Sequence, residues 1–177
     1  MSIADPTGLN FEELRDRYAR ERERRQSAGD RRYRDIADVS PDLVADPYTT
    51  PVPRAPINDE VDVLVVGGGF GGLLTAARLR QAGVKKVRIV EAGGDVGGAW
   101  YWNRYPGAAC DVESYIYLPL LEETGYMPLE RYSKAAEIRD YCRLVARHFD
   151  LYDDAIFSTQ VTRLTWAADG ARWLLCA

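Results

Sequence analysis

The sequence predicts an α/β fold built on a parallel sheet, and three features near its centre carry this prediction. The apolar and mostly β-branched residues Val61, Val63, Leu64, Val65 and Val66 form a run of the length of one buried strand. A glycine-rich run, 67–72, follows at once and leads into a helical segment, 73–81, which Gly83 ends. A second apolar strand, 87–90, completes the order strand, tight turn, helix, strand, which is typical of a nucleotide-binding unit.

The glycines match the pattern G-x-G-x-x-G, and each has a chemical reason. Gly67 permits the sharp turn out of the strand, Gly69 lets the backbone approach a pyrophosphate, and Gly72 lets helix and sheet pack tightly. The phosphates would lie at the helix N-terminus, where unpaired N–H groups and the helix dipole favour an anion. Glu91, at the end of the second strand, can accept hydrogen bonds from ribose hydroxyls and would repel a 2′-phosphate. We therefore expect FAD or NAD rather than NADP here, with a glycine-rich surface loop as the alternative.

The composition of the chain narrows the remaining classes of function. Its 177 residues carry a formal net charge of −4, which gives no general attraction to nucleic acid or anionic lipid. No apolar run approaches the roughly 20 residues of a membrane helix, and the N-terminus lacks a secretory apolar core. A single histidine argues against a His-based metal site, and three widely spaced cysteines indicate reduced thiols. We therefore expect a cytoplasmic protein without a metal and without a nucleic-acid or membrane partner.

Residues 1–58 differ in pattern from the rest and predict an N-terminal extension. Asn10 and Glu13 have the spacing of a capping box, ahead of a charged helix from about Phe11 to Gln26. Five prolines then predict an extended tether with little regular structure. The arginine-rich helix could contact nucleic acid, but its interleaved acids favour a solvated helix on the surface of its own protein.

A second glycine cluster distinguishes flavin binding from nicotinamide binding. Gly93, Gly94, Gly97 and Gly98 stand where an ordinary dinucleotide domain would continue into another helix. They lead into the aromatic run 99–105, AWYWNRY, whose flat faces and polar edges suit a planar ring system. Because apolar, aromatic pockets with few polar groups bind ligands, we expect this loop to bind one. A tightly packed aromatic loop without a ligand is the alternative.

The run from Gly97 to Asp111, GGAWYWNRYPGAACD, followed by VESYIYLP, resembles the FAD-binding segment of the Baeyer–Villiger monooxygenases. These enzymes use FAD, NADPH and O₂ to insert oxygen beside the carbonyl of a ketone. The resemblance covers about Asn58 to Ala177, and it implies a Rossmann-like FAD-binding domain with a parallel sheet, helices and a small β-meander over residues 59–177. Because family members run to several hundred residues, it also implies an incomplete domain. The chain would then be the N-terminal part of an enzyme, without the NADPH site and inactive alone.

The resemblance also assigns roles to individual residues. Those implied to hold FAD are Gly67, Gly69, Phe70 and Gly72 at the pyrophosphate, Glu91 at the ribose, Ala99, Trp100 and Trp102 at the flavin, Tyr117 beside the cofactor, and Val161 at the adenine. Asp111 matches an acid near the flavin that pairs with an active-site arginine, which here lies outside this chain. That pairing would keep Asp111 ionised. The alternatives are a turn role for Asp111 and simple core packing for Tyr117 and Val161.

The remainder of the chain has the pattern of a scaffold. Ser133 is the predicted cap of a helix from about Lys134 to Phe149, whose apolar residues recur at helical spacing. Short strands are expected at 155–157, 160–166 and 172–176, with a turn at Asp169-Gly170 between the last two.

Two classes of function remain open at this point. The first is the FAD-binding part of a Baeyer–Villiger monooxygenase, whose small-molecule partners would be a ketone, NADPH and O₂. The second is a stand-alone flavin- or nucleotide-binding module in which the N-terminal helix has an interaction role. Another class of flavin monooxygenase is a further alternative.

Overall fold

The computed structural model describes residues 10–27, 40 and 44–177. The chain divides into two compact units, with the division between Ala45 and Asp46. This division precedes the boundary predicted at residue 58, because the segment from Asp46 to Thr49 makes side-chain contacts with the second unit. Part of the proline-rich tether therefore belongs to the compact domain.

The first unit contains one described helix, α1 (Phe11–Ser27). The side chain of Asn10 accepts hydrogen bonds from the backbone N–H groups of Glu12 and Glu13, at 3.1 and 3.2 Å, so the predicted N-cap is confirmed. Acids in the first turn and arginines in the last complement the helix dipole. Within the described residues, neither α1 nor any other helix is long and apolar enough to cross a membrane.

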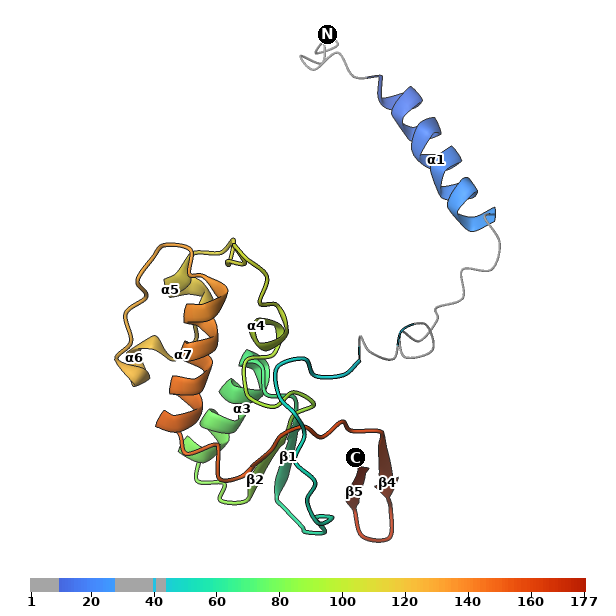
Figure 1. Cartoon of the computed structure of the whole chain (residues 1–177). Coiled ribbons are helices and arrows are strands. Elements are labelled where there is room, and N and C mark those ends of the chain that lie inside the picture. The colour runs from blue at the N-terminus through green and yellow to red at the C-terminus, as the bar shows by residue number, and fades with distance from the viewer. Residues whose placement is uncertain (1–9, 28–39, 41–43) are drawn as a thin grey trace. The chain divides into compact units, whose positions relative to one another are not determined.

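The second unit is organised by a three-stranded parallel sheet in the order β1-β2-β3, namely β1 (Val63–Val66), β2 (Val87–Val90) and β3 (Ala155–Ile156). Helix α3 (Phe70–Gln81) connects β1 to β2 (Figure 1). The predicted strand–turn–helix–strand unit is thus confirmed. The helix begins at Phe70 rather than Leu73, so its N-terminus lies inside the glycine motif. Strand β1 is an edge of this sheet, and Val66 at its end is 56% exposed.

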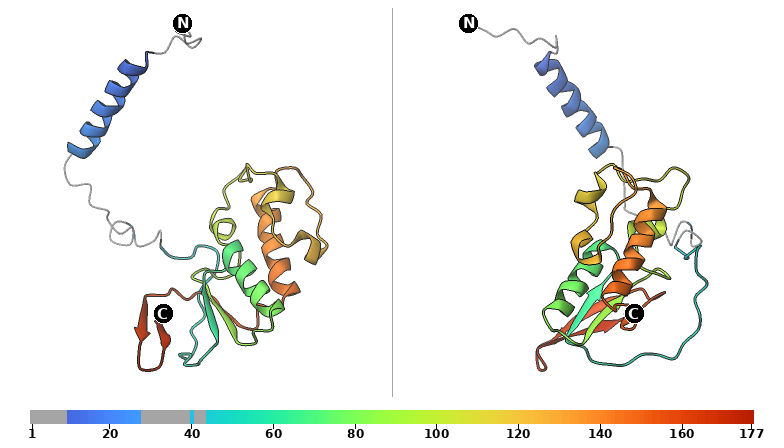
Figure 2. Two further views of the ribbon diagram at one scale, coloured as in Figure 1. Left: turned by 180° about the vertical axis from the view of Figure 1, so that it is seen from behind. Right: turned by 90° about the vertical axis from the view of Figure 1, so that its left-hand side faces the viewer.

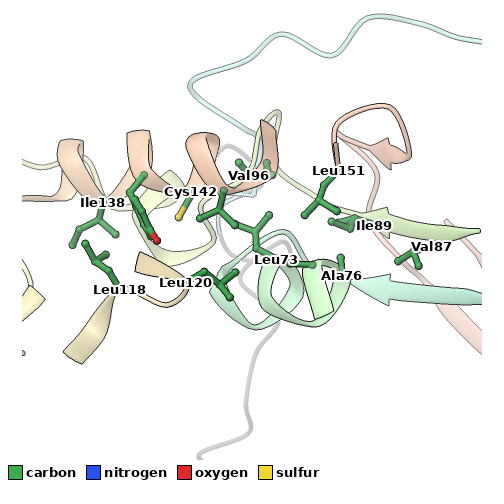
Figure 3. Close-up of a cluster of buried hydrophobic side chains, with 14 of the residues drawn as sticks. Leu73, Ala76, Val87, Ile89, Val96, Leu118, Leu120, Ile138, Cys142 and Leu151 are labelled. Atoms are coloured by element: carbon green, nitrogen blue, oxygen red, sulfur yellow. The ribbon is translucent and has the colours of Figure 1, made fainter. Parts of the chain in front are cut away.

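The core lies where α3 meets β2 and α7 (Ala135–His148), as Figure 3 shows. Leu73 from α3 and Ile138 and Val145 from α7 are completely buried. The predicted helix is confirmed, but its predicted cap is wrong. The Ser133 hydroxyl lies 2.8 Å from the hydroxyl of Ser114 and does not cap the helix, whose N-cap residue is Lys134.

Three one-turn helices occupy the long connection between β2 and α7: α4 (Ala99–Trp102), α5 (Ser114–Tyr117) and α6 (Leu121–Thr124). The aromatic run 99–105, expected as a loop, therefore begins with a helical turn. A single turn has no helical periodicity to reveal it in the sequence, because the apolar stripe appears only over several turns.

A separate two-stranded hairpin, β4 (Arg163–Ala167) and β5 (Arg172–Cys176), ends the chain (Figure 2). The turn 168–171 contains the predicted Asp169-Gly170, and the rings of Trp166 and Trp173 lie on opposite strands with centroids 5.4 Å apart. Strand β4 begins at Arg163, later than predicted.

Candidate cofactor-binding site

Helix α3 begins without a side-chain cap, and there is open space beside two of the glycines at its start. The backbone turns at Gly67, whose φ is +99° and whose N–H donates to the Val90 carbonyl at 2.8 Å. Gly69 is the N-cap, and no side chain caps the helix. A β-carbon added at Gly67 or Gly71 would have no atom within 4 Å. This first turn can therefore receive an anion, as a pyrophosphate site requires.

The last glycine of the motif, Gly72, allows close packing between helix and strand. A β-carbon at Gly72 would lie 1.9 Å from the carbonyl oxygen of Gly67, well inside any possible contact. Only glycine at this position allows the start of α3 to pack this closely against the turn that follows β1, as the sequence predicted.

Glu91 joins the two glycine-rich loops. Its Oε2 accepts the N–H of Gly68 at 2.5 Å, and its Oε1 accepts the N–H of Gly93 at 2.6 Å. The side chain is only 6% exposed, so these charge-assisted bonds compensate for the burial of a carboxylate. Each oxygen of a carboxylate can accept two hydrogen bonds, so both retain capacity for a further donor.

The two glycine loops also touch directly. The N–H of Gly97 donates to the carbonyl of Gly68 at 2.9 Å, and a β-carbon at Gly98 would lie 2.8 Å from the α-carbon of Gly69. Helix α4 begins at Ala99, immediately after this contact. The segments predicted to bind pyrophosphate and flavin are therefore neighbours at the carboxyl ends of the parallel strands, where ligands bind in open α/β sheets.

Three of the predicted aromatic residues form one cluster beside this junction. The indole N–H of Trp100 donates to the hydroxyl of Tyr117 at 2.9 Å, and the Phe70 and Tyr117 rings pack edge to face with centroids 5.5 Å apart. Trp102 lies outside this cluster, 37% exposed and edge-on to the ring of Tyr101. The tryptophans of α4 therefore have different surroundings, one fixed by a hydrogen bond and one partly open to solvent.

Two predicted site residues are not brought into contact with the others. Asp111 is exposed and makes no hydrogen bond or ion pair with any residue that the structure describes. Val161 is half-buried in the irregular segment before β4. That segment starts beside the site, since the N–H of Thr159 donates to the Glu91 carbonyl at 2.9 Å.

Several polar residues around the second glycine loop were not predicted from the sequence. Asp46 accepts hydrogen bonds from the N–H of Gly94 at 2.9 Å and from the hydroxyl of Tyr101 at 2.5 Å. Asp95, within the loop, accepts from the hydroxyl of Tyr152 at 2.8 Å and from Arg143 at 2.7 Å. An Asp-Pro pair such as Asp46-Pro47 is a turn signal, but turn chemistry does not reveal a partner far along the chain.

These contacts shift the acid–base behaviour of the Asp46–Tyr101 pair. Burial raises the pKa of the Asp46 carboxyl, but hydrogen bonds from Tyr101 and from the N–H groups of Tyr48, Gly94 and Thr49 outweigh burial and lower it overall. Burial and the neighbouring Asp46 raise the pKa of Tyr101. The pair is therefore an ionised carboxylate bound by a neutral phenol at neutral pH.

Fold and site together define a Rossmann-like dinucleotide-binding domain. Residues 65–127 match the family model of the NAD(P)-binding Rossmann-like domain. A Baeyer–Villiger monooxygenase of Streptomyces coelicolor is 52% identical to this chain over 164 residues, which are 92% of the chain and 27% of that relative. The chain thus spans about a quarter of the length of the relatives it matches.

Solved structures give the same result. The polycyclic ketone monooxygenase of Thermothelomyces thermophila superimposes with a TM-score of 0.69 at 36% identity, over 85% of this chain and 24% of that one. OTEMO in complex with FAD and NADP superimposes with a TM-score of 0.61 at 34% identity, over 66% of this chain and 22% of that one. The chain belongs to the family of the Baeyer–Villiger monooxygenases, as the aromatic run indicated.

Proposed function

We propose that this chain is the N-terminal, FAD-binding part of a monooxygenase that converts ketones to esters or lactones with NADPH and O₂. One observation carries the proposal: Glu91 joins the open N-terminus of α3 to the glycine loop that leads into the tryptophan helix α4. An anion site and an aromatic surface next to each other suit the diphosphate and the ring system of FAD. The structural relative OTEMO, which was solved with FAD and NADP, supports the same assignment.

The residues present fit this cofactor. Gly67, Gly69, Phe70 and Gly72 would hold the pyrophosphate, since no side chain caps the first turn of α3 and there is open space beside Gly67 and Gly71. Glu91 would accept a ribose hydroxyl with a lone pair that the loop N–H groups leave free.

The other predicted contacts remain part of the proposal. Ala99, Trp100 and Trp102 would line the flavin, and Tyr117 would support it through its hydrogen bond with Trp100. Asp111, exposed and without a described partner, would position an arginine from outside this chain. Val161 would meet the adenine from the segment that starts beside Glu91. Bound FAD, reduced by NADPH, would supply the reaction with O₂ that transfers one oxygen atom to the ketone.

We also propose that the protein works in the cytoplasm. All three cysteines lie in the described part of the chain and are free, and Cys110 and Cys142 are buried. Unpaired thiols are the usual state in a reducing compartment.

The test uses the protein expressed from its complete gene. We expect it to be yellow, to bind FAD in a fluorescence titration, and to consume NADPH faster when a cyclic ketone is present. Analysis of the product should show an ester or lactone containing one added oxygen atom. Ketone-independent NADPH use without any such product would refute the proposal.

A variant at Glu91 tests the site itself. Glu91→Gln replaces one acceptor oxygen with an N–H₂ group that faces a loop N–H, so we expect FAD affinity to fall about tenfold, equivalent to roughly 1.4 kcal/mol. Glu122→Gln, at an exposed position on α6, is the matched control and should bind FAD as the wild type does. Equal affinity in both variants would contradict the ribose role.

A further inference from the structure

We infer that residues 46–49, which precede the dinucleotide-binding unit in the sequence, are part of the cofactor site. They act as positioning residues that fix the second glycine loop and α4, and this inference rests on the proposed function. The sequence pattern places these residues in a tether, yet their side chains reach the segment 94–102.

Asp46 binds both the second glycine loop and helix α4, which follows it. Its Oδ2 accepts the N–H of Gly94 at 2.9 Å and the hydroxyl of Tyr101 at 2.5 Å, while its Oδ1 accepts the N–H of Tyr48 at 2.8 Å. The Tyr101 hydroxyl also lies 2.9 Å from that of Thr49. One carboxylate therefore holds a loop backbone, a helix side chain and its own segment together.

The segment lies directly against the loop. A β-carbon at Gly94 would be 2.3 Å from the hydroxyl oxygen of Thr49, so the loop can approach only because this residue is glycine. Tyr101 is 1% exposed, and the ring of Tyr48 packs edge to face against it, with centroids 5.8 Å apart. Hydrogen bonds and close packing therefore both join the segment 46–49 to the second glycine loop and α4.

Tyr48 also fixes the end of α4. Its hydroxyl donates to the carbonyl of Trp102 at 3.0 Å, one of the carbonyls that this short helix cannot satisfy itself. The guanidinium of Arg104 lies 3.7 Å from the centroid of the Tyr48 ring and 4.6 Å from that of Tyr101, and its Nε donates to the Tyr101 carbonyl at 2.8 Å.

A four-residue helix needs such support. Isolated helices shorter than about 12 residues are marginal in water, so the four residues of α4 depend on tertiary contacts for their conformation. Asp46, Tyr48 and Thr49 supply contacts at both its buried face and its C-terminal end. The orientation of Trp100 and Trp102 therefore depends on a segment outside the glycine motifs.

The experiment compares variants of the protein expressed from its complete gene. Asp46→Asn keeps the shape of the side chain but replaces one acceptor with a donor and removes the charge. The control, Asp59→Asn, changes an acid ten residues after Thr49 in the sequence, whose ion-pair partner is Arg88 in β2. FAD affinity is measured by fluorescence titration of the cofactor-free protein, and backbone amide exchange is measured without cofactor.

We expect Asp46→Asn to bind FAD at least about fivefold more weakly, because a hydrogen bond to a charged group is lost. Its Gly94 amide should exchange faster, while the core amides of Leu73 and Val145 exchange as in the wild type. Asp59→Asn should match the wild type in both measurements. In Tyr101→Phe, the further effect of Asp46→Asn on affinity should shrink, since the two residues share one hydrogen bond.

Unchanged exchange at Gly94, or wild-type FAD affinity in Asp46→Asn, would overturn the inference. Faster exchange throughout the protein would also overturn it, because that result marks a general loss of stability. A wild-type protein that binds no FAD would refute the proposed function. Even then, selectively faster exchange at Gly94 would support the positioning role, and unchanged exchange would reject it.

Discussion

At the level of single residues, roles set by the local backbone could be predicted from the sequence, and contacts between distant segments could not. The motif predicted the structural roles of Gly67 and Gly72 correctly, because local backbone geometry requires a glycine at each position. The ribose role of Glu91 stays a prediction. The contact of Glu91 with both loops was not predicted, since it depends on how the second loop folds back on the first. Asp46 was missed for the same reason: its partners Gly94 and Tyr101 are remote in sequence.

A pair of neighbouring glycines provides a sharp test at this scale. Gly72→Ala places a methyl group against the Gly67 carbonyl, so we expect a loss of several kcal/mol in the free energy of unfolding. Gly71→Ala adds a methyl group in open space within the same helix and should stabilise the cofactor-free protein by up to about 1 kcal/mol. Urea denaturation of the two variants measures both values. Similar stabilities would show that α3 does not pack this closely on β1.

At the scale of elements, length decided what could be predicted. The helices α1, α3 and α7 and the strands β2 and β5 were predicted to within a few residues. The signals were a capping pattern for α1, the glycine motif for α3, apolar residues at helical spacing for α7, and apolar runs for the strands. The one-turn helices were not predicted, because tertiary contacts rather than propensity hold them.

Helices α3 and α7 end in the same motif with different residues. In α3 the N–H of Val84 donates to the Leu79 carbonyl beyond Gly83, and in α7 the N–H of Leu151 donates to the Ala146 carbonyl beyond Asp150. Both intervening residues have positive φ, +88° at Gly83 and +52° at Asp150. Only the glycine adopts this conformation without a steric cost.

We therefore expect Asp150→Gly to raise the free energy of unfolding by about 0.5–1 kcal/mol, helped by the removal of an acid from a helix C-terminus. The reciprocal change, Gly83→Ala, should lower it by about 1 kcal/mol, although the site has room for a methyl group. Thermal denaturation of both variants checks the pair. A stability loss in Asp150→Gly would mean that the aspartate side chain itself contributes to the helix end.

For the whole molecule, the sequence predicted the parallel sheet and its helices, because the order of elements restricts the topology. The position of the compact unit's start, at Asp46, could not be predicted. Composition marks residues 46–58 as a tether, and only their contacts assign them to the domain.

The charges of the molecule predict its response to acid. Among the acids that the structure describes, four have a lowered pKa in the folded state: Asp46, Glu113, Glu123 and Glu137. At Glu137, burial raises the pKa, but hydrogen bonds from Leu129, Ser133 and Tyr126 outweigh burial. The unfolded chain therefore binds more protons, so these groups stabilise the fold above their ordinary pKa values and lose that effect as the pH falls through the folded ones.

We expect the free energy of unfolding to be nearly constant between about pH 7 and pH 5 and to fall below about pH 4, as urea titrations at fixed pH would measure. Glu137→Gln should show a shallower acid dependence than the wild type. Stability that rises on acidification would contradict the sign of these shifts.

The edge position of β1 has a practical consequence for anyone who purifies these 177 residues. Its outer side offers main-chain donors and acceptors to any extended peptide of similar length, and an apolar valine stands at the end of the row. Concentrated samples should therefore self-associate by strand addition. A short, soluble peptide that pairs with Val63–Val66 should keep them monomeric.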